Sequence, residues 1–99
     1  RAEKLSYKTI ISNPESAIYL DTYGWILYEL NRNNEAIEYL EKAVKLSDDP
    51  DVLFHYAEAL FKSGNIQKAG EYYKMALEKG YDSEIINPKL DLCRWKLRI

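Results

Sequence analysis

Residues 20–43, LDTYGWILYELNRNNEAIEYLEKA, decide the fold, because a degenerate copy of this stretch returns 33 residues later in a chain of 99 residues. The matching positions are apolar or small, and they pair as Leu20 with Leu53, Tyr23 with Tyr56, Gly24 with Ala57, Leu27 with Leu60, Ala36 with Ala69, Tyr39 with Tyr72, Leu40 with Tyr73 and Ala43 with Ala76. A fixed period of this length is typical of helical repeat proteins. The sequence therefore predicts an all-α solenoid built of antiparallel helix pairs.

Small residues mark the places where neighbouring helices are expected to approach most closely. Gly24 lies in the middle of a predicted helix, where glycine is less favourable than alanine by about 1 kcal/mol. Such a residue is understandable if another helix packs directly against it. The closest helix contacts are predicted at Gly24, Ala36, Ala43, Ala57, Ala69 and Ala76. Asn31 and Gly64 fall at the equivalent turn of each copy, and both residue types tolerate the left-handed conformation that ends a helix.

The two copies resemble the tetratricopeptide repeat family. The first copy reads Leu20-x-x-Tyr23-Gly24-x-x-Leu27 followed by Ala36-x-x-x-Leu40-x-x-Ala43, and the second reads Leu53-x-x-Tyr56-Ala57-x-x-Leu60 followed by Ala69-x-x-x-Tyr73-x-x-Ala76. The spacing is one residue shorter than the family's 34, and Asp48 and Tyr81 replace its late proline. The resemblance implies a superhelix of this family's type. The stretch LDTYGWILYEL is also similar to terminal repeats of large bacterial envelope-associated members, which implies a periplasmic or envelope-associated location, with the cytoplasm as the alternative.

The period and the turn signals divide residues 1–99 into parts of a single domain. Residues 1–14 are interpreted as the second helix of a truncated repeat, or alternatively as an unrelated cap, and residues 15–49 and 50–81 as two full repeats. Helices are expected at residues 15–30, from Asn33 or Asn34, at residues 52–62 after an Asp49 cap, and at residues 66–79. Residues 82–99 depart from the repeat and are predicted to form a capping helix.

That last helix is predicted to begin at Lys89, after a cap formed by Asn87 and Pro88. Its apolar stripe is expected at Ile86, Leu90, Cys93 and Leu97, which would cover the open end of the solenoid. The alternative is a basic amphipathic helix for a membrane surface or a partner.

Composition and residue types disfavour most catalytic functions. The formal net charge of −2 gives no electrostatic footprint of a nucleic-acid binder, and no apolar run is long enough to insert directly into a membrane. His55 is the only histidine, so neither a catalytic triad nor a multi-histidine metal site can be built within the chain. Asp48, Asp49 and Asp51 fit helix capping better than a calcium loop, which would need alternating oxygen ligands and a central glycine. The sequence therefore predicts no enzyme activity, no metal and no cofactor.

The resemblance also implies where a partner would bind. In this family the first helix of each pair lines a concave groove, and the corresponding positions are Ile18, Asp21, Trp25, Tyr28, Asp51, Phe54, Glu58 and Phe61, with His55 and Lys62 at the edge. The family's lysine/asparagine clamp for a terminal carboxylate is missing, since Asp21, Trp25 and His55 stand in its place. Aromatic groups with a few acids suit an apolar or basic segment, with Trp25 and Tyr28 as anchors.

Two functions stay open at this stage. The first is a scaffold whose groove binds a peptide or a helix of a partner protein. The second is a purely structural terminal segment of a longer solenoid, in which the same aromatic residues pack against an upstream helix. A homo-oligomer is also expected, because Leu5, Ile10 and the face around Trp25 would lack their usual neighbour in a chain that begins with half a repeat.

Overall fold

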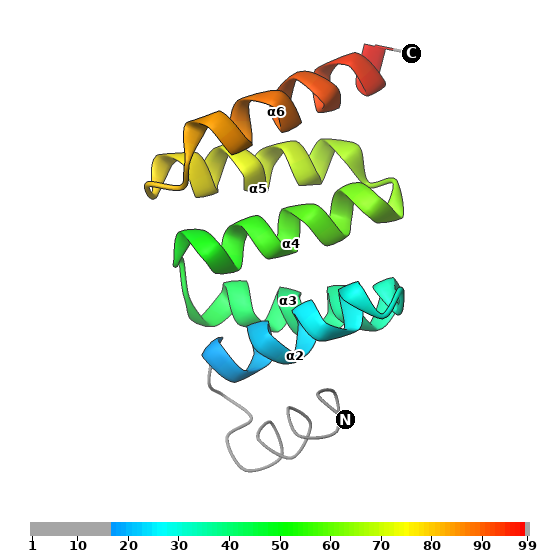
Figure 1. The fold of residues 1–99 in the computed structure, drawn as a ribbon, viewed down its shortest axis with the longest axis vertical. Coiled ribbons are helices and arrows are strands. Elements are labelled where there is room, and N and C mark those ends of the chain that lie inside the picture. Colours follow the sequence, from blue (N-terminus) through cyan, green and yellow to red (C-terminus); the bar gives the residue numbers. More distant parts are fainter. Residues whose placement is uncertain (1–16, 99) are drawn as a thin grey trace.

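The structure, a computed structural model, describes residues 17–98, and within this range it contains five α-helices and no strand (Figure 1). The helices are α2 (Ala17–Glu29), α3 (Asn33–Leu46), α4 (Pro50–Ser63), α5 (Ile66–Glu78) and α6 (Ser83–Arg98). From α3 onward each helix packs antiparallel against the one before it, and α2 also contacts α4. The predicted all-α solenoid of antiparallel helix pairs is therefore confirmed. The predicted helix at residues 1–14 and the start of the next one at residue 15 lie outside the described residues.

The 33-residue period reappears in the core. Leu20 and Leu53 are 2% and 1% exposed, and Leu27 and Leu60 are 0% and 3% exposed. The alanines at the predicted close contacts, Ala36, Ala43, Ala57, Ala69 and Ala76, have no exposed surface. Matching positions are therefore buried in the core in both copies.

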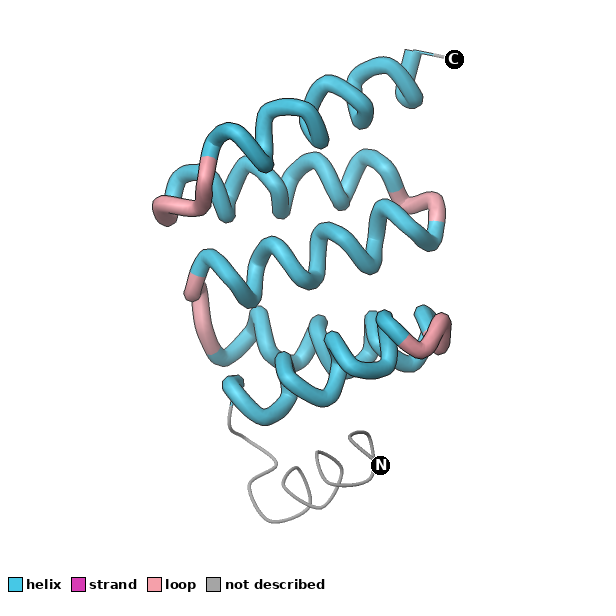
Figure 2. Tube along the Cα trace, viewed as in Figure 1, coloured by secondary structure: helices cyan, strands magenta, loops and turns pink. Residues whose placement is uncertain are grey.

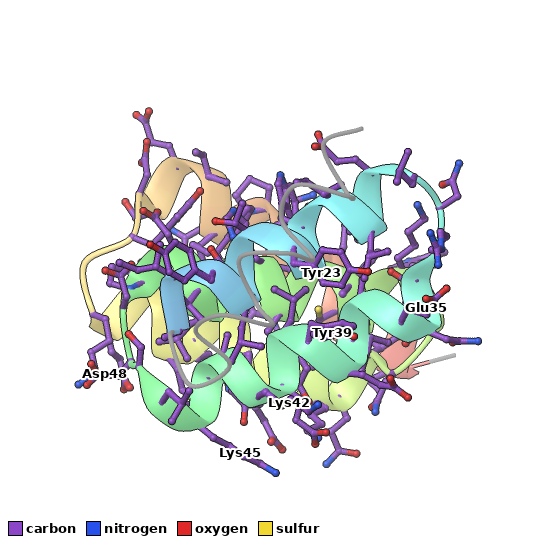
Figure 3. All side chains as sticks on the ribbon, turned by 90° about the horizontal axis from the view of Figure 1, so that it is seen from below. Tyr23, Glu35, Tyr39, Lys42, Lys45 and Asp48 are labelled. Atoms are coloured by element: carbon purple, nitrogen blue, oxygen red, sulfur yellow. The ribbon has the colours of Figure 1, made fainter. Side chains whose placement is uncertain are left out.

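An aromatic pair between the two helices of each repeat also recurs. Tyr23 on α2 meets Tyr39 on α3 edge to face, with 4.6 Å between ring centroids (Figure 3). Tyr56 on α4 and Tyr72 on α5 form the equivalent pair at 4.7 Å. Edge-to-face contact is a favourable geometry for aromatic rings, so it reinforces the pairing of first and second helices in each repeat.

Gly24 is needed because α3 crosses α2 at this residue. A Cβ atom placed on Gly24 would lie 2.7 Å from Leu40 Cγ and 3.3 Å from the carbonyl oxygen of Ala36. Real side chains do not approach so closely, so the close approach predicted from the sequence is confirmed.

The four turns between these helices alternate between the two edges of the molecule (Figure 2), and three of them share one backbone design. Asn31, Gly64 and Gly80 have positive φ angles of 64°, 93° and 107°. In each turn the residue after the left-handed one donates its N–H to a carbonyl five residues earlier, as Arg32 does to Leu27 at 2.9 Å and Asn65 does to Leu60 at 3.0 Å. This is the Schellman pattern, which satisfies carbonyls left open at a helix end.

The fourth turn, between α3 and α4, ends with a side-chain cap. Asp49 Oδ1 accepts a hydrogen bond from the Asp51 N–H at 2.9 Å, and Pro50 is the first residue of α4. The predicted cap at Asp49 is confirmed, although α4 begins two residues earlier than the predicted start at Val52. A proline at the first helical position costs nothing there because its missing N–H would have no partner.

The prediction for the C-terminal helix was wrong in two respects. Helix α6 begins at Ser83, not at Lys89, and Pro88 lies inside it. Asp82 supplies the cap, because its Oδ1 accepts a hydrogen bond from the Glu84 N–H at 2.9 Å. The earlier start is explained by Ile86, which is fully buried and lies on the packed face of α6 only if the helix already includes it.

The tail also continues the repeat where the sequence was interpreted as departing from it. Its buried residues are Ile86, Leu90 and Cys93, and they follow Leu53, Ala57 and Leu60 by 33 positions each. Helix α6 thus packs on α5 as α4 packs on α3, and it takes the place of the first helix of a further repeat. Leu97, the fourth residue of the predicted stripe, is 55% exposed.

Candidate interaction surface

The predicted binding positions lie on α2 and α4, and the structure brings the central ones together as stacked rings. Trp25 stacks on Tyr28 with 4.6 Å between ring centroids and a 10° interplanar angle. On its other side Trp25 stacks on His55 of α4 at 4.1 Å and 23°. His55 Nδ1 in turn lies 2.8 Å from Asp21 Oδ1. Trp25 is thus held from both sides while part of its surface stays accessible.

Phe54 and Tyr81 extend this arrangement along α4. The two rings stack at 4.4 Å and 12°, and Phe54 lies next to His55 with 6.3 Å between centroids. We call Tyr28, Trp25, His55, Phe54 and Tyr81 the aromatic row. Phe54 is only 9% exposed, so it belongs to the core and offers little surface to a partner. Burial, followed by the negative charges of nearby acids, raises the pKa of the Tyr81 phenol.

Glu58, another predicted site residue, is engaged within the chain. Its Oε1 accepts a short hydrogen bond from the Tyr73 hydroxyl and lies 3.3 Å from Lys89 Nζ on α6. Its side chain is 15% exposed. Burial raises the pKa of Tyr73 far above its usual range, and the hydrogen bond to Glu58 adds to this effect. The phenol therefore stays protonated and keeps donating to the carboxylate.

A hollow of about 730 Å³ is lined by residues from the C-terminal parts of α2 and α4, from the start of α5 and from α6. Its lining combines rings and aliphatic groups with charged groups: Tyr28, Phe61, Ile66 and Trp95, then Glu58, Lys62, Lys89 and Lys96, with Gly64 at the turn. We call this space the lysine hollow. Only Tyr28 is shared with the aromatic row, so the hollow continues the same surface toward α6.

Two lysines of the hollow lie over aromatic rings. Lys62 Nζ is 4.7 Å from the centroid of Tyr28 and donates to Asn31 Oδ1 at 2.7 Å. Lys96 Nζ is 5.7 Å from the centroid of Phe61. Cations over ring faces are favourable at these distances. Within residues 17–98 neither ammonium group forms an ion pair with a carboxylate.

Two predicted positions lie apart from the row and the hollow. Ile18, in the first turn of α2, is 72% exposed, and Asp51 is an exposed residue in the first turn of α4. The sequence reasoning also missed Tyr81, Lys89, Trp95 and Lys96. For Lys89, Trp95 and Lys96 the missed signal was the 33-residue period, because it places α6 where the first helix of a further repeat would lie and so brings these side chains to this surface.

The part of the chain from residue 17 to residue 98 holds no group of three or more histidine, cysteine or acidic residues placed to bind a metal ion. Over the same residues, no helix has the length and apolar character needed to cross a membrane. Cys93 is buried, and burial raises the pKa of its thiol.

The repeated helix pairs define a class of protein, the helical repeat solenoids that present surfaces to other proteins. A model of the tetratricopeptide repeat matches residues 23–84, and the chain therefore belongs to the tetratricopeptide repeat family. Domains of this family are typically non-catalytic and mediate contacts between proteins. The similarity of LDTYGWILYEL to bacterial envelope-associated members is not confirmed by these matches.

Known proteins share parts of this chain. It is 30% identical over 109 residues to a protein of Schizosaccharomyces pombe described as DnaJ homolog subfamily C member 7 homolog, a match that covers 95% of the chain and 22% of the relative. The crystal structure of MamA superposes with a TM-score of 0.89 at 21% identity, covering 96% of this chain and 56% of that one. The structure of Naa15/Naa10 bound to HypK-THB superposes with a TM-score of 0.79 at 20% identity, covering 99% and 15%. The chain thus spans about a fifth of the curated relative.

Proposed function

We propose that this chain is a non-catalytic protein–protein interaction scaffold. The first helices of its two repeats, α2 and α4, would bind a peptide or a helical segment of a partner protein. The contact would centre on Trp25 and Tyr28, and the edge residues His55 and Lys62 would flank it. The remaining positions implied by the family, Ile18, Asp21, Asp51, Glu58 and Phe61, would frame the same contact. Membership of a family that mediates protein contacts supports this function, as does the likeness to the structure of Naa15/Naa10 bound to HypK-THB, in which proteins are bound to one another.

The observation that carries the proposal is the position of Trp25. Stacking on Tyr28 and His55 fixes the orientation of its ring, and yet the side chain is not fully buried. Aromatic side chains that are already ordered lose little conformational entropy on binding, and they dominate the energetics of most interfaces. A preordered, half-buried tryptophan is therefore a suitable anchor for a partner segment.

A second function is favoured by the contacts that these rings already make with one another within the chain. Phe54 is buried in the core, and Trp25 already has aromatic contacts on both sides. In this alternative the chain is a structural segment of a longer solenoid without a ligand of its own. The short fraction of the curated relative that it spans is consistent with this alternative.

One variant separates the two functions. Random peptides of roughly 12 residues would be selected for binding to the full chain, and their affinity and the free energy of unfolding would be measured for Trp25→Ala. A binding surface predicts a loss of about 2 kcal/mol or more in affinity with the fold retained. Tyr19→Ala is the matched control, since Tyr19 is a part-exposed aromatic residue of the same helix outside the aromatic row. Loss of stability with unchanged affinity would refute the binding function.

Self-association belongs to this proposal as well. Leu5 and Ile10, which were expected to leave an apolar patch together with the Trp25 face, lie outside the described residues. We expect the chain to dimerise or to exchange its first segment between copies, because exposed apolar patches mark interfaces. Sedimentation equilibrium that shows only monomer at high concentration would contradict this expectation.

A further inference from the structure

We propose that the partner segment is an acidic internal stretch of a protein. It carries aspartate or glutamate on both sides of an aromatic or aliphatic residue, and this residue enters the lysine hollow. The inference rests on the proposed scaffold function and specifies the chemistry of its ligand. It reverses the preference for a basic segment that the sequence alone suggested.

The first step is that Asp21 and Glu58, two acids of this surface, are already engaged within the chain. Asp21 lies against His55, and its side chain is 14% exposed. Glu58 is held by Lys89 and by the Tyr73 hydroxyl. A carboxylate that is engaged in this way has little capacity left for a cation of another chain, since attracting one would require breaking a contact that exists already.

The second step is that two of the three lysines of the hollow, Lys62 and Lys96, are not paired with a carboxylate among the described residues. Lys62 is an exposed residue, and its ammonium group has one hydrogen bond, to the neutral amide oxygen of Asn31. Lys96 is likewise exposed and contacts the ring of Phe61. Together with Lys89, three lysines face a single glutamate in the lining. The net field in the hollow therefore favours carboxylates.

The third step is the apolar surface that the lysines surround. Trp95 on α6 is 61% exposed, and it lines the hollow with Phe61 and Ile66. An exposed tryptophan beside other apolar groups is typical of an interaction site. The volume of about 730 Å³ lies within the range of pockets that hold ligands, so one large side chain can enter while its acidic neighbours meet the lysines at the rim.

The same features argue for side-chain carboxylates of a protein over other anions. The lysine/asparagine clamp that would hold a free terminal carboxylate is absent, because Asp21 and Trp25 occupy its positions. Nucleic acid is disfavoured by Glu58 inside the lining and by the formal net charge of −2 for the chain.

The test uses two labelled peptides of roughly 12 residues, each acetylated and amidated so that no terminal charge remains. Both carry phenylalanine and leucine at the same positions, with aspartate and glutamate between them in one and with lysine and arginine in the other. We expect the acidic peptide to bind about tenfold more tightly, which corresponds to roughly 1.4 kcal/mol. This preference should weaken as salt reduces the Debye length from about 10 Å at 0.1 M to about 3 Å at 1 M.

Charge reversal then assigns the binding to the hollow. The double variant Lys62→Glu/Lys96→Glu should lose at least about tenfold in affinity for the acidic peptide. The matched control is Lys42→Glu/Lys45→Glu on α3, where both lysines point away from the helical stack (Figure 3). Lys42 also lies over a ring, that of Tyr39, as the lysines of the hollow do. This control should bind as the unmodified chain does. If the reversed variant loses its helical circular dichroism, Lys62→Gln/Lys96→Gln replaces it, with a smaller loss expected.

Each alternative outcome overturns the inference in a recognisable way. Tighter binding of the basic peptide, with sensitivity to Trp25→Ala, would overturn the acidic preference and leave the scaffold function standing. Binding of a peptide only when its terminal carboxylate is free, or tighter binding of oligo-dT than of the acidic peptide, would assign the hollow to a different ligand. Failure of both peptides at millimolar concentration would overturn the inference, while peptides selected at random would still test the scaffold function.

Discussion

Replacing Gly24 by alanine should destabilise the chain, although alanine is the better helix former. The new methyl group would lie 2.7 Å from Leu40 Cγ and 3.0 Å from its Cδ2. Leu40 cannot easily retreat, because it has no exposed surface. The backbone carbonyl of Ala36, 3.3 Å from the same point, closes the other side. Helices α2 and α3 would have to separate or Leu40 would have to leave its preferred rotamer.

The expected change in the free energy of unfolding for Gly24→Ala follows from two opposing contributions. Removing a glycine from a helix interior gains up to about 1 kcal/mol. Forcing an additional methyl group into a filled core costs about 1–3 kcal/mol. The net change should therefore be a decrease of up to about 2 kcal/mol in the free energy of unfolding, because the cost of overpacking offsets or exceeds the gain in helix propensity.

Urea unfolding followed by circular dichroism measures this change, and Gly70→Ala provides the control. Gly70 lies inside α5, but a Cβ atom there would be 3.7 Å from Cys93 Cβ, an ordinary contact distance. Gly70→Ala should therefore stabilise the chain by about 0.5–1 kcal/mol. Leu40→Ala alone should cost about 2–5 kcal/mol, and much less when combined with Gly24→Ala, because the added methyl group then occupies part of the cavity. A Gly24→Ala chain as stable as Gly70→Ala would refute the close approach of α2 and α3.

Three further predictions concern the core and α6. Ala43→Leu should lower the free energy of unfolding by about 1–3 kcal/mol, because Ala43 has no exposed surface; an unchanged melting temperature would contradict the proposed helix register. Pro88→Ala should stabilise the chain by about 1–3 kcal/mol, because an N–H is restored inside α6, and a lower midpoint of urea unfolding would argue against this. Iodoacetamide should alkylate Cys93 slowly until urea unfolds the chain. Burial raises the pKa of this thiol above its ordinary value, so the folded chain should react more slowly than the unfolded chain, and the part of this difference that comes from ionisation should shrink as pH rises through the higher folded pKa. Equal rates in the folded and unfolded chain would exclude this environment.

The parts of the fold that depend on neighbouring residues in the sequence could be predicted. Apolar positions at helical spacing, Asp49 before Pro50 and the left-handed turn residues Asn31 and Gly64 each report on a local conformation. The start of α6 could not be predicted in the same way, because the local signal at Asn87 and Pro88 competes with the burial of Ile86. The stabilisation from tertiary packing of Ile86 exceeds the destabilisation caused by one proline in the helix.

For the candidate site, which stays a prediction, the family's pattern indicated residues that lie together, whereas the pairing of charges could not be predicted. The family's pattern named Trp25, Tyr28 and His55, and the structure stacks them. However, a list of acids in the sequence cannot tell which ones are neutralised. The pairing of Glu58 with Lys89 depends on a helix that the sequence placed incorrectly, and this pairing changes the expected ligand from basic to acidic.

The turn between α3 and α4 has a mechanical consequence. The other three turns are locked by a left-handed residue and paired backbone hydrogen bonds. Here the chain runs extended through Ser47, with φ −152° and ψ 141°. The relative orientation of residues 17–46 and 50–98 is therefore set less by this turn than by the packing of α3 on α4 and the contact of α2 with α4. The stacking of Trp25 on His55 joins the same two parts, as do the contact of Asp21 with His55 and the hydrogen bond from Lys62 to Asn31. The curvature of the solenoid at this turn thus depends on side-chain contacts between repeats.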